Sequence, residues 1–304
     1  MSDIKLISDE TPIEVRKYNS KIEQLEVGKP GKVGILDIEL KENDQNKTVI
    51  TKQFSQVPLQ IQRAVYPENS LPGMAYLYII SPSGGILQGD RYKTDIRLRN
   101  NSICHITTQG ATRIYSMNSN SASQMVNITL DENCYLEYIP DQIIPYQNSR
   151  YYQKVNLNIH DNATLIYSEV LTPGRIAMNE NFDYDICYLR TYCKNQNNKF
   201  RCLENMKIEP KENNMRIKGI LGKYDIVGTV YILTKKEKLQ KLEKMINEKI
   251  EFITSGTSIL PNESGIIVKI LSNSTEEVYE KIYEIVKITR KEIIGADFTK
   301  IRKN

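Results

Sequence analysis

The side chains most able to do chemistry in this chain carry oxygen, and few of them are histidine or cysteine. Six carboxylates stand near glycine, proline or aromatic residues: Glu68, Asp90, Glu137, Asp141, Glu169 and Glu180. Hydroxyl, amide and guanidinium groups accompany them at Thr107, Thr108, Gln109, Thr112 and Arg175. Two or more carboxylates that converged in a cleft would bind a divalent cation transiently, or would form an acid–base pair of the glycosidase kind.

A tight soft-metal site and an ordinary enzyme are both disfavoured. The chain has only two histidines, and Cys104 and His105 are adjacent, so on a strand their side chains point to opposite faces. Cys187 and Cys193 would stand about 20 Å apart along a regular strand. The chain has no nucleophile elbow and no dinucleotide fingerprint. We expect the five cysteines to be mostly buried and unpaired in disulfides.

A glycine-rich loop runs from Ser81 to Asp90 and contains Gly84, Gly85 and Gly89. It lacks the Lys-Ser/Thr pair of a phosphate-binding P-loop and no helix pattern follows it. We expect a turn with a bulge, in which the glycines supply positive φ. Two roles stay open for Asp90: it binds the amides of the turn, or it belongs to a binding surface.

Composition restricts the class of protein and its partners. The 304 residues carry a net charge of only +4, and the basic residues are mixed with acidic ones, so nucleic acid is not the expected partner. No apolar run approaches the roughly 18 residues of a membrane span. The first residues lack the pattern of a secretory signal. We therefore expect a cytoplasmic protein that forms one domain over residues 1–304.

The residue pattern predicts a mainly β protein: a β body over residues 1–233, followed by an α-β-α tail over 234–304 packed on it. Alternating or β-branched runs predict strands at Thr48–Phe54, Leu59–Tyr66, Met74–Ile80 and Gln124–Leu130. In the tail, a capping box at Thr234 and Glu237 begins a helix that stops near Gly256. Gly265–Leu271 is expected to be a strand. A second helix lies between Ser274, with Glu277 as its capping partner, and Gly295.

A weak internal repeat predicts how the β body is built. Three segments share a strand, a turn at asparagine followed by a small residue, and a second strand; the turn residues Asn101, Asn133 and Asn162 are about 30 positions apart. Asparagine tolerates the positive φ of such a turn. Successive rungs of a stacked, β-helical body would show this spacing. Stacking would bring one group of residues to a single edge of the body: Thr108, Gln109, Asp141, Glu169 and Arg175.

Five motifs in this chain resemble, in order, those of the urease accessory protein D family, called H in some organisms. They are Pro82-x-Gly84-Gly85-x-x-x-Gly89-Asp90; Thr107-Thr108-Gln109-x-Ala111-Thr112-Arg113-x-Tyr115; Leu136-Glu137-Tyr138-Ile139-Pro140; Glu169 with Gly174-Arg175 and Glu180-x-Phe182; and Leu260-Pro261 with the strand Ile266–Leu271. The chain departs from the family where it reads Asp141-Gln142 in place of Gln-Asp/Glu, and where Asn179 replaces a glycine.

The resemblance implies a non-catalytic scaffold with a β-helical or stacked body and two C-terminal helices. It implies docking on apo-urease, joining of accessory protein F and the GTPase accessory protein G, and assistance in delivering nickel to urease. It also implies a polar interior passage in which nickel is held only transiently, with no tightly bound cofactor. The residues expected to line or brace this passage are Glu68, Asp90, Thr107, Thr108, Gln109, Thr112, Asp141, Glu169, Arg175 and Glu180. Gly84, Gly85, Gly89 and Gly174 are expected to shape its backbone.

Two other functions remain open on the residues alone. One is a carbohydrate-active β-solenoid enzyme with paired carboxylates among Glu137, Asp141 and Glu169, although strand alternation would send Glu137 to solvent. The absence of tryptophan counts against it, because sugar sites usually stack on aromatic rings. The other is a protein-interaction module that docks through its C-terminal helices and has no role with metal.

Overall fold

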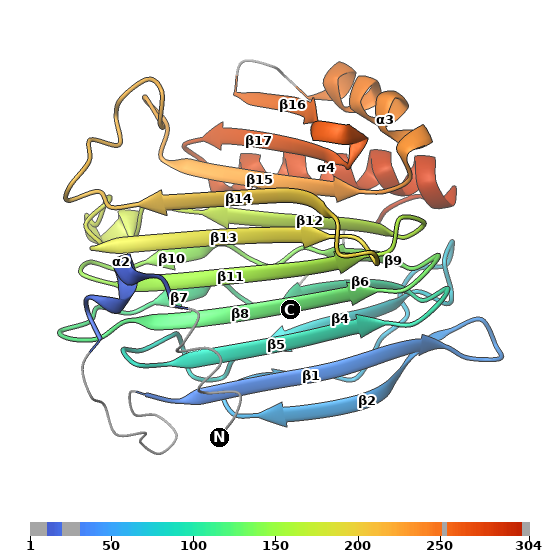
Figure 1. Cartoon of the computed structure of the whole chain (residues 1–304), viewed down its shortest axis with the longest axis horizontal. Coiled ribbons are helices and arrows are strands. Elements are labelled where there is room, and N and C mark those ends of the chain that lie inside the picture. Colours follow the sequence, from blue (N-terminus) through green and yellow to red (C-terminus); the bar gives the residue numbers. More distant parts are fainter. Residues whose placement is uncertain (1–10, 20–30, 251–253, 300–304) are drawn as a thin grey trace.

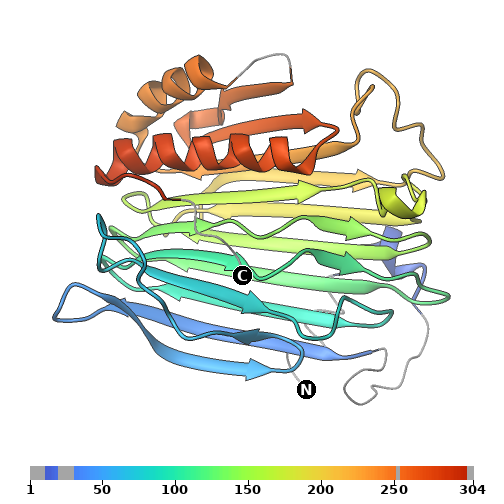
Figure 2. The same cartoon turned by 180° about the vertical axis from the view of Figure 1, so that it is seen from behind.

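Two facing β-sheets, with helices over the outer face of one of them, make up the body of the protein (Figure 1). The computed structural model describes residues 11–19, 31–250 and 254–299. The fold is mainly β, as the strand patterns predict, and the helices lie near the C-terminus (Figure 2). Within the described ranges, no helix combines the length and the apolar character that crossing a membrane requires.

The first sheet has seven strands. In spatial order they are β14 (Phe200–Ile208), β13 (Ile186–Lys194), β11 (Arg150–Ile159), β8 (Ala122–Leu130), β5 (Arg91–Leu98), β1 (Val33–Glu42) and β2 (Thr48–Gln56). The five inner strands pair in parallel, and β2 and β14 close the two edges in antiparallel orientation.

The second sheet has ten strands, with two short strands beside its main path. Its spatial order is β16 (Ser255–Ile259), β17 (Ile266–Ser272), β15 (Ile226–Leu233), β12 (Thr164–Leu171), β9 (Tyr135–Tyr138), β6 (Ile103–Thr108), β4 (Ala75–Ile80) and β3 (Gln60–Ile61). β10 (Ile143–Pro145) pairs with β12 and with β7 (Thr112–Ile114). The middle of this sheet, from β4 to β12, is also parallel.

The repeated segments stack as rungs, as their spacing predicts. Each rung places its first strand in one sheet and its second strand in the other, so β5, β8 and β11 stack on one side and β6, β9 and β12 on the other. Asp95, Asn127 and Asn156 align in register. The Asn127 amide donates to Asp95 at 2.6 Å, and the Asn156 amide donates to Asn127 at 2.8 Å. This polar ladder fixes the register of the three rungs on the outer face.

Two of the three repeat turns use the conformation expected of asparagine. Asn101 and Asn133 adopt left-handed backbone angles, with φ of 64° and 58°. The third turn forms without positive φ at Asn162. Asparagine therefore occupies the turn in all three rungs, but its backbone is left-handed in only two of them.

The C-terminal part contains α3 (Lys236–Lys249) and α4 (Thr275–Ile294), and the prediction for α4 is confirmed at both ends. Ser274 accepts a hydrogen bond from the Glu277 amide at 3.4 Å, and Gly295 ends the helix with φ of 69°. The predicted capping box of α3 is wrong. Its N-cap is Lys235, because the Thr234 hydroxyl is buried against that of Thr164 at 2.7 Å.

The segment after α3 also differs from the prediction. The helix ends at Lys249, and β16 then takes up Gly256, so the tail has the order α-β-β-α. Elsewhere, the strands expected at Thr48–Phe54, Met74–Ile80 and Gln124–Leu130 are present as β2, β4 and β8. The strand expected at Leu59–Tyr66 shrinks to β3 and one isolated bridge. Prolines flank that stretch, and proline cannot donate to a ladder.

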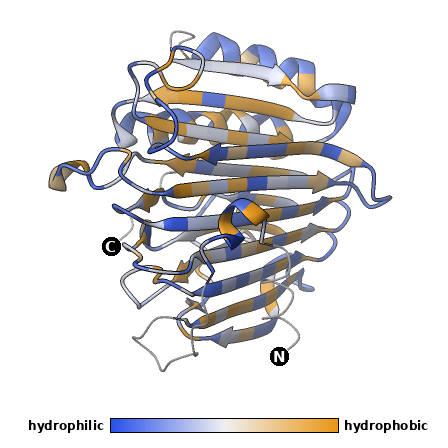
Figure 3. Ribbon diagram, turned by 60° about the vertical axis from the view of Figure 1, so that its left-hand side comes forward, coloured by the Kyte–Doolittle hydropathy of each residue, from blue (hydrophilic) through white to orange (hydrophobic). Residues whose placement is uncertain are grey.

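Two large hydrophobic cores result from this arrangement, and a small cluster packs Val15 of α2 (Ile13–Arg16) against Tyr152 on the outer face of the seven-stranded sheet. The larger core fills the space between the sheets with residues such as Leu36, Ile96, Leu136 and Leu165. The second core lies between the outer face of the ten-stranded sheet and the two long helices, and includes Val230, Leu242 and Ile282. Alternating hydrophilic and hydrophobic residues along the strands supply these faces (Figure 3). The ten-stranded sheet is therefore covered on both faces over much of its area.

Candidate functional site

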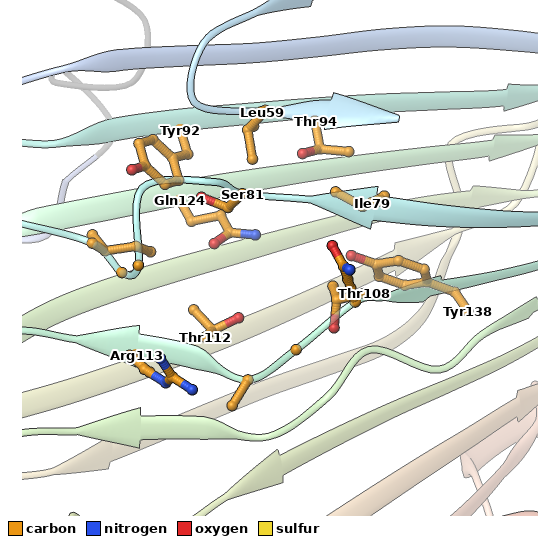
Figure 4. A pocket seen from close by; sticks show the side chains of 16 residues that line it. Leu59, Ile79, Ser81, Tyr92, Thr94, Thr108, Thr112, Arg113, Gln124 and Tyr138 are labelled. Carbon is orange, nitrogen blue, oxygen red and sulfur yellow. The ribbon is translucent and has the colours of Figure 1, made fainter. Parts of the chain in front are cut away.

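A cavity of about 240 Å³ lies between the sheets, beside the glycine-rich loop. Thr94 of β5, Gln124 of β8 and Tyr138 of β9 line it, together with Thr108 and Thr112 (Figure 4). Its remaining lining comes from three groups of residues: Leu59 and Ile79; Ser81, Gly84, Gly85, Ile86 and Tyr92; and Gln109, Gly110, Ala111 and Arg113. The lining is thus rich in hydroxyl and amide groups although the surrounding core is apolar.

A smaller cavity of about 30 Å³ continues this polar region toward β12. It shares Thr108, Thr112, Gln124 and Tyr138 with the larger cavity. Asp141 and Glu169 join the lining here, together with Gln153 and Tyr167. Rung stacking therefore brings Thr108, Asp141 and Glu169 around one space, while Gln109 lines only the larger cavity.

Glu169 is a buried carboxylate held by uncharged donors. The Gln153 amide donates to it at 2.7 Å and the Tyr167 hydroxyl at 2.9 Å. Burial raises the pKa of Glu169 to about 7, although these two hydrogen bonds and the distant Lys269 oppose the shift. The side chain therefore exchanges a proton close to neutral pH.

Equivalent positions of successive strands extend this polar region along the stack. The rings of Tyr138, Tyr167 and Tyr231 align in register and stack with centroid distances of 5.7 and 5.6 Å. On the facing sheet, the Tyr151 hydroxyl donates to Gln124 at 3.0 Å and lies 3.1 Å from the Gln153 oxygen. The path of polar groups thus runs across the strands, parallel to the direction in which the rungs stack.

Sequence reasoning missed Gln124, Gln153 and the tyrosines of this region. The signal was present in the internal repeat, because Gln124 and Gln153 stand three residues before Asn127 and Asn156 and pair in register. The interior-facing positions of one rung predict those of the next, since side chains alternate with a period of two along each strand.

Asp90 holds the glycine-rich loop and lines neither cavity. Its fully buried carboxylate accepts hydrogen bonds from the amides of Lys32 at 2.8 Å and Leu87 at 2.9 Å, and from the Tyr92 hydroxyl at 3.1 Å. The Lys32 ammonium lies 3.7 Å away. Burial nevertheless raises the pKa of Asp90 above its ordinary value. Of the two roles left open for this residue, the structure supports the one that braces the turn.

The glycines allow close approach of neighbouring groups. A Cβ atom on Gly85 would lie 2.3 Å from the Tyr115 ring, so this position beside the larger cavity has no room for a side chain. Gly174 has φ of 139°, and a Cβ there would lie 2.9 Å from the Glu180 carbonyl oxygen. Gly84 and Gly89 also have positive φ.

The two neighbouring threonines at the end of β6 point to opposite sides of the sheet. Thr107 is buried away from both cavities, and its hydroxyl donates to the Ile139 carbonyl at 2.6 Å. Thr108 faces the cavities, and its hydroxyl accepts from the Asp141 amide at 2.8 Å. Both hydroxyls therefore tie the exit of one rung to the exit of the next.

Arg175 and Glu180 form an ion pair with one another and line neither cavity. The Arg175 Nε atom lies 2.8 Å from Glu180, and the guanidinium stacks on Tyr146 with 3.9 Å to the ring centroid. Hydrogen bonding from Arg175 lowers the pKa of Glu180. The Gln147 amide also donates to Glu180, at 3.2 Å. The pair fixes the loop after β12 against the segment that follows β10.

Glu68 and Glu137 belong to a separate buried cluster beneath α4. The fully buried Arg290 of α4 contacts Glu68 at 2.6 Å, Glu137 at 2.6 and 2.8 Å, and the Tyr76 hydroxyl at 2.9 Å. His105 lies 2.7 Å from Glu137. Burial alone would raise the pKa of Glu137, but hydrogen bonds from His105 and Arg290 lower it to about 2. Glu68 therefore lines neither cavity.

The expectation that Glu137 points to solvent is wrong. Alternation does send it to the face opposite Leu136 and Tyr138, but α4 covers that face. Glu169 lies on the interior face, at the small cavity, so the ten-stranded sheet separates it from Glu137. These two residues cannot act as the acid–base pair of a glycosidase, which requires both carboxylates on one substrate.

The cysteines and acids of the described ranges offer no ready chelate. Four of the five cysteines are buried, as expected, and all five are free. Over residues 11–19, 31–250 and 254–299, no three side chains among His, Cys, Asp and Glu lie close enough to hold one metal ion. The oxygen atoms around the two cavities belong mainly to hydroxyl and amide groups, with Asp141 and Glu169 as the carboxylates.

Comparison with known proteins gives a consistent result along nearly the whole chain. The family profile of the UreD urease accessory protein matches residues 32–303. A urease accessory protein UreD of Cenarchaeum symbiosum is 48% identical over 283 residues, which cover 92% of this chain and 99% of that protein. Urease accessory protein UreD 2 of Brucella suis biovar 1 is 37% identical over 288 residues, which cover 93% of this chain and 95% of that protein. A urease accessory protein UreD of Yersinia pseudotuberculosis is 34% identical over 287 residues, which cover 93% of this chain and 89% of that protein.

Proposed function

Because this chain belongs to the UreD urease accessory protein family, we propose that it is a non-catalytic scaffold that assists delivery of nickel to urease through its polar interior. Membership of the family makes it a protein of urease maturation. In this proposal the chain docks on apo-urease in the cytoplasm and joins accessory proteins F and G. Nickel is the cargo of this assembly and is held only transiently by the chain.

The observation that carries this proposal is the pair of adjoining cavities lined by oxygen-bearing side chains. Thr108 and Thr112 reach this space from one rung, Asp141 and Glu169 reach it from the next two, and Gln109 lies at the larger cavity. Hydroxyl, amide and carboxylate oxygens are hard ligands that bind nickel less tightly than thiolate or imidazole. A conduit requires binding favourable enough for entry and weak enough for exit.

Four of the other predicted residues act as braces in this proposal, while Glu68 belongs to the Arg290 cluster and has no part in the passage. Asp90 holds the glycine-rich loop, Thr107 ties two rung exits together, and Arg175 with Glu180 fixes the loop after β12. Gly84 and Gly85 keep the wall of the larger cavity free of side chains. Loss of a brace would distort the passage without removing an oxygen ligand from it.

The test is co-expression with a urease operon that lacks its own D component, followed by measurement of nickel per urease and of urease activity. The chain should restore both. Glu169→Gln, which keeps the size and hydrogen bonds of the side chain but removes the charge, should lower nickel per urease at least severalfold while the complex with apo-urease still forms. The matched control is Glu39→Gln, whose carboxylate pairs with Arg99 at the surface of β1.

Two results would contradict the proposal. A chain that forms the complex without restoring nickel would be a docking module alone. Full nickel loading by a variant with Glu169→Gln and Asp141→Asn together would show that the interior carboxylates do not serve delivery.

A further inference from the structure

An ion pair lies between the sheets at the end of the stack opposite β1 and β2. Glu204 projects inward from β14, the last strand of the seven-stranded sheet, and Lys269 projects inward from β17 of the other sheet. The Lys269 ammonium donates to Glu204 and, at 2.9 Å, to the Thr229 hydroxyl. The Tyr231 hydroxyl donates to the other oxygen of Glu204. The side chains of Glu204 and Lys269 are 25% and 39% exposed, so this pair borders solvent.

One row of register-matched positions joins this ion pair to the small cavity. Glu169 of β12 pairs with Thr229 of β15, which pairs with Lys269 of β17. The neighbouring row carries Tyr167 and Tyr231, whose rings stack at 5.6 Å. Tyr167 donates to Glu169, and Tyr231 donates to Glu204. Thr229 and Tyr231 of β15 therefore stand in register between the strand of the buried carboxylate and the strand of Lys269.

The oxygen atoms around the Lys269 ammonium are those that a hard cation prefers. A carboxylate and a threonine hydroxyl accept from the ammonium, and a tyrosine hydroxyl adjoins the same carboxylate. Lysine is a point charge on a flexible stem, and its partial exposure gives it a route to solvent. The ammonium can therefore leave without rearrangement of the strands.

We propose that Glu204 and Lys269 form a second opening of the interior passage, in which Lys269 occupies a weak oxygen-ligand site that a divalent cation takes over in transit. The first opening is the larger cavity beside the glycine-rich loop. The inference rests on the proposed function, because a second opening matters only if a cation moves through the interior. It assigns Lys269 the role of a built-in counter-ion that keeps Glu204 neutralised when no cation is present.

The experiment is calorimetric titration of the purified chain with Ni²⁺ alone, near pH 7.5. Lys269→Met removes the competing charge, so Ni²⁺ should bind about fivefold more tightly or better, as expected when a like charge is removed from a partly exposed site. Adding Glu204→Gln to that variant should abolish the gain. The matched control is Lys211→Met, because Lys211 also pairs with an acid, Asp185, and is 45% exposed.

The inference is overturned if Lys269→Met leaves the affinity within twofold of the wild type. It is also overturned if the double variant binds as tightly as Lys269→Met. Lys269→Gln serves as a second probe if the methionine variant unfolds, since it keeps a polar contact to Thr229 and lacks the charge.

The titration and the urease assay fail independently. Loss of nickel delivery in Glu169→Gln, together with an unchanged affinity in Lys269→Met, would overturn the second opening and leave the proposed function standing. The reverse pattern, tighter binding in Lys269→Met with no effect of interior variants on urease, would overturn the proposed function and with it the role in transit.

Discussion

Two buried glutamates of this protein have opposite electrostatic environments. Glu169 receives hydrogen bonds only from uncharged groups, and its pKa rises to about 7. Glu137 is surrounded by His105 and Arg290, which hold its pKa at about 2. The nature of the donors, and not the depth of burial, decides the difference. A carboxylate compensated by cations is suited to structure, while one without them can accept a transient cation.

Glu169→Gln should make the protein more stable at alkaline pH. The carboxyl group has a folded pKa of about 7 against an ordinary 4.5, so the folded state holds its proton more tightly than the unfolded state. Stability therefore falls as pH rises between those values, by up to about 3 kcal/mol. The neutral amide avoids this loss. Urea unfolding at pH 8 and pH 4.5 should show a gain at the higher pH and little difference at the lower.

An equal effect of Glu169→Gln at both pH values would mean that the carboxyl group titrates normally in the fold. The exposed pair of Lys244 and Glu248 offers a control, since Glu248→Gln on α3 should change stability little at either pH.

Among the elements, the rungs are held in register by side chains as well as by backbone pairing. Asn127 of β8 stands between Asp95 of β5 and Asn156 of β11, and it donates to one and accepts from the other. A slip by one residue would break both hydrogen bonds and would turn the interior side chains outward. The ladder thus couples the outer surface of the sheet to the composition of the cavities.

Asn127→Asp should destabilise the stack at neutral pH. The new carboxylate would face Asp95 across a contact that is now 2.6 Å, so a hydrogen bond becomes a repulsion. We expect a loss of about 1–2 kcal/mol at pH 7, decreasing toward pH 4 as the carboxylates protonate. Denaturant unfolding at both pH values measures it. Asn158→Asp, at an exposed site of β11, is the control and should cost less than about 0.5 kcal/mol.

The rung architecture was predictable from sequence because its signals are local and repeated. The turns at Asn101 and Asn133, and the cap at Ser274, depend only on nearby residues and were found. Contacts between segments that are distant in the sequence could not be predicted in this way. Thr234 does not cap α3 because its hydroxyl is hydrogen-bonded to that of Thr164. The pattern of β9 predicts solvent at Glu137 because the residues of β9 do not indicate that α4 covers this face. The Glu204 and Lys269 pair joins two sheets and has no sequence signature.

In the assembled fold, α4 closes the outer face of the ten-stranded sheet, and besides its apolar contacts it carries one buried cation that reaches several strands. Arg290 reaches Glu137 on β9, Tyr76 on β4 and Glu68 in the segment before β4. The ring of Phe298, beyond the end of the helix, stacks on the guanidinium, and its centroid lies 4.6 Å from the Arg290 Cζ atom. The C-terminal helix and the early part of the chain are therefore joined through one buried cation.

Arg290→Met should destabilise the whole fold by about 3–5 kcal/mol, because it leaves two buried carboxylates without their cation. Combining it with Glu137→Gln should recover part of the loss, which separates the charge effect from packing. Chemical unfolding followed by circular dichroism measures both. Lys287→Met, at an exposed ion pair of the same helix, should change stability by less than about 0.5 kcal/mol. A similarly small effect of Arg290→Met would contradict this role of the buried cation.

The strict alternation of the rung strands also limits how such a chain can change in length during evolution. Inserting or deleting one residue inside β8 would invert the facing of every side chain beyond it, and the walls of the cavities would exchange with the outer surface. A change of length in the turns near Asn101 and Asn133, which connect one sheet to the other, would leave the facing of the strand side chains unchanged. Homologous chains that grow or shrink should therefore do so at the turns, and the span from each turn to the interior hydroxyl, amide and carboxylate groups should stay constant.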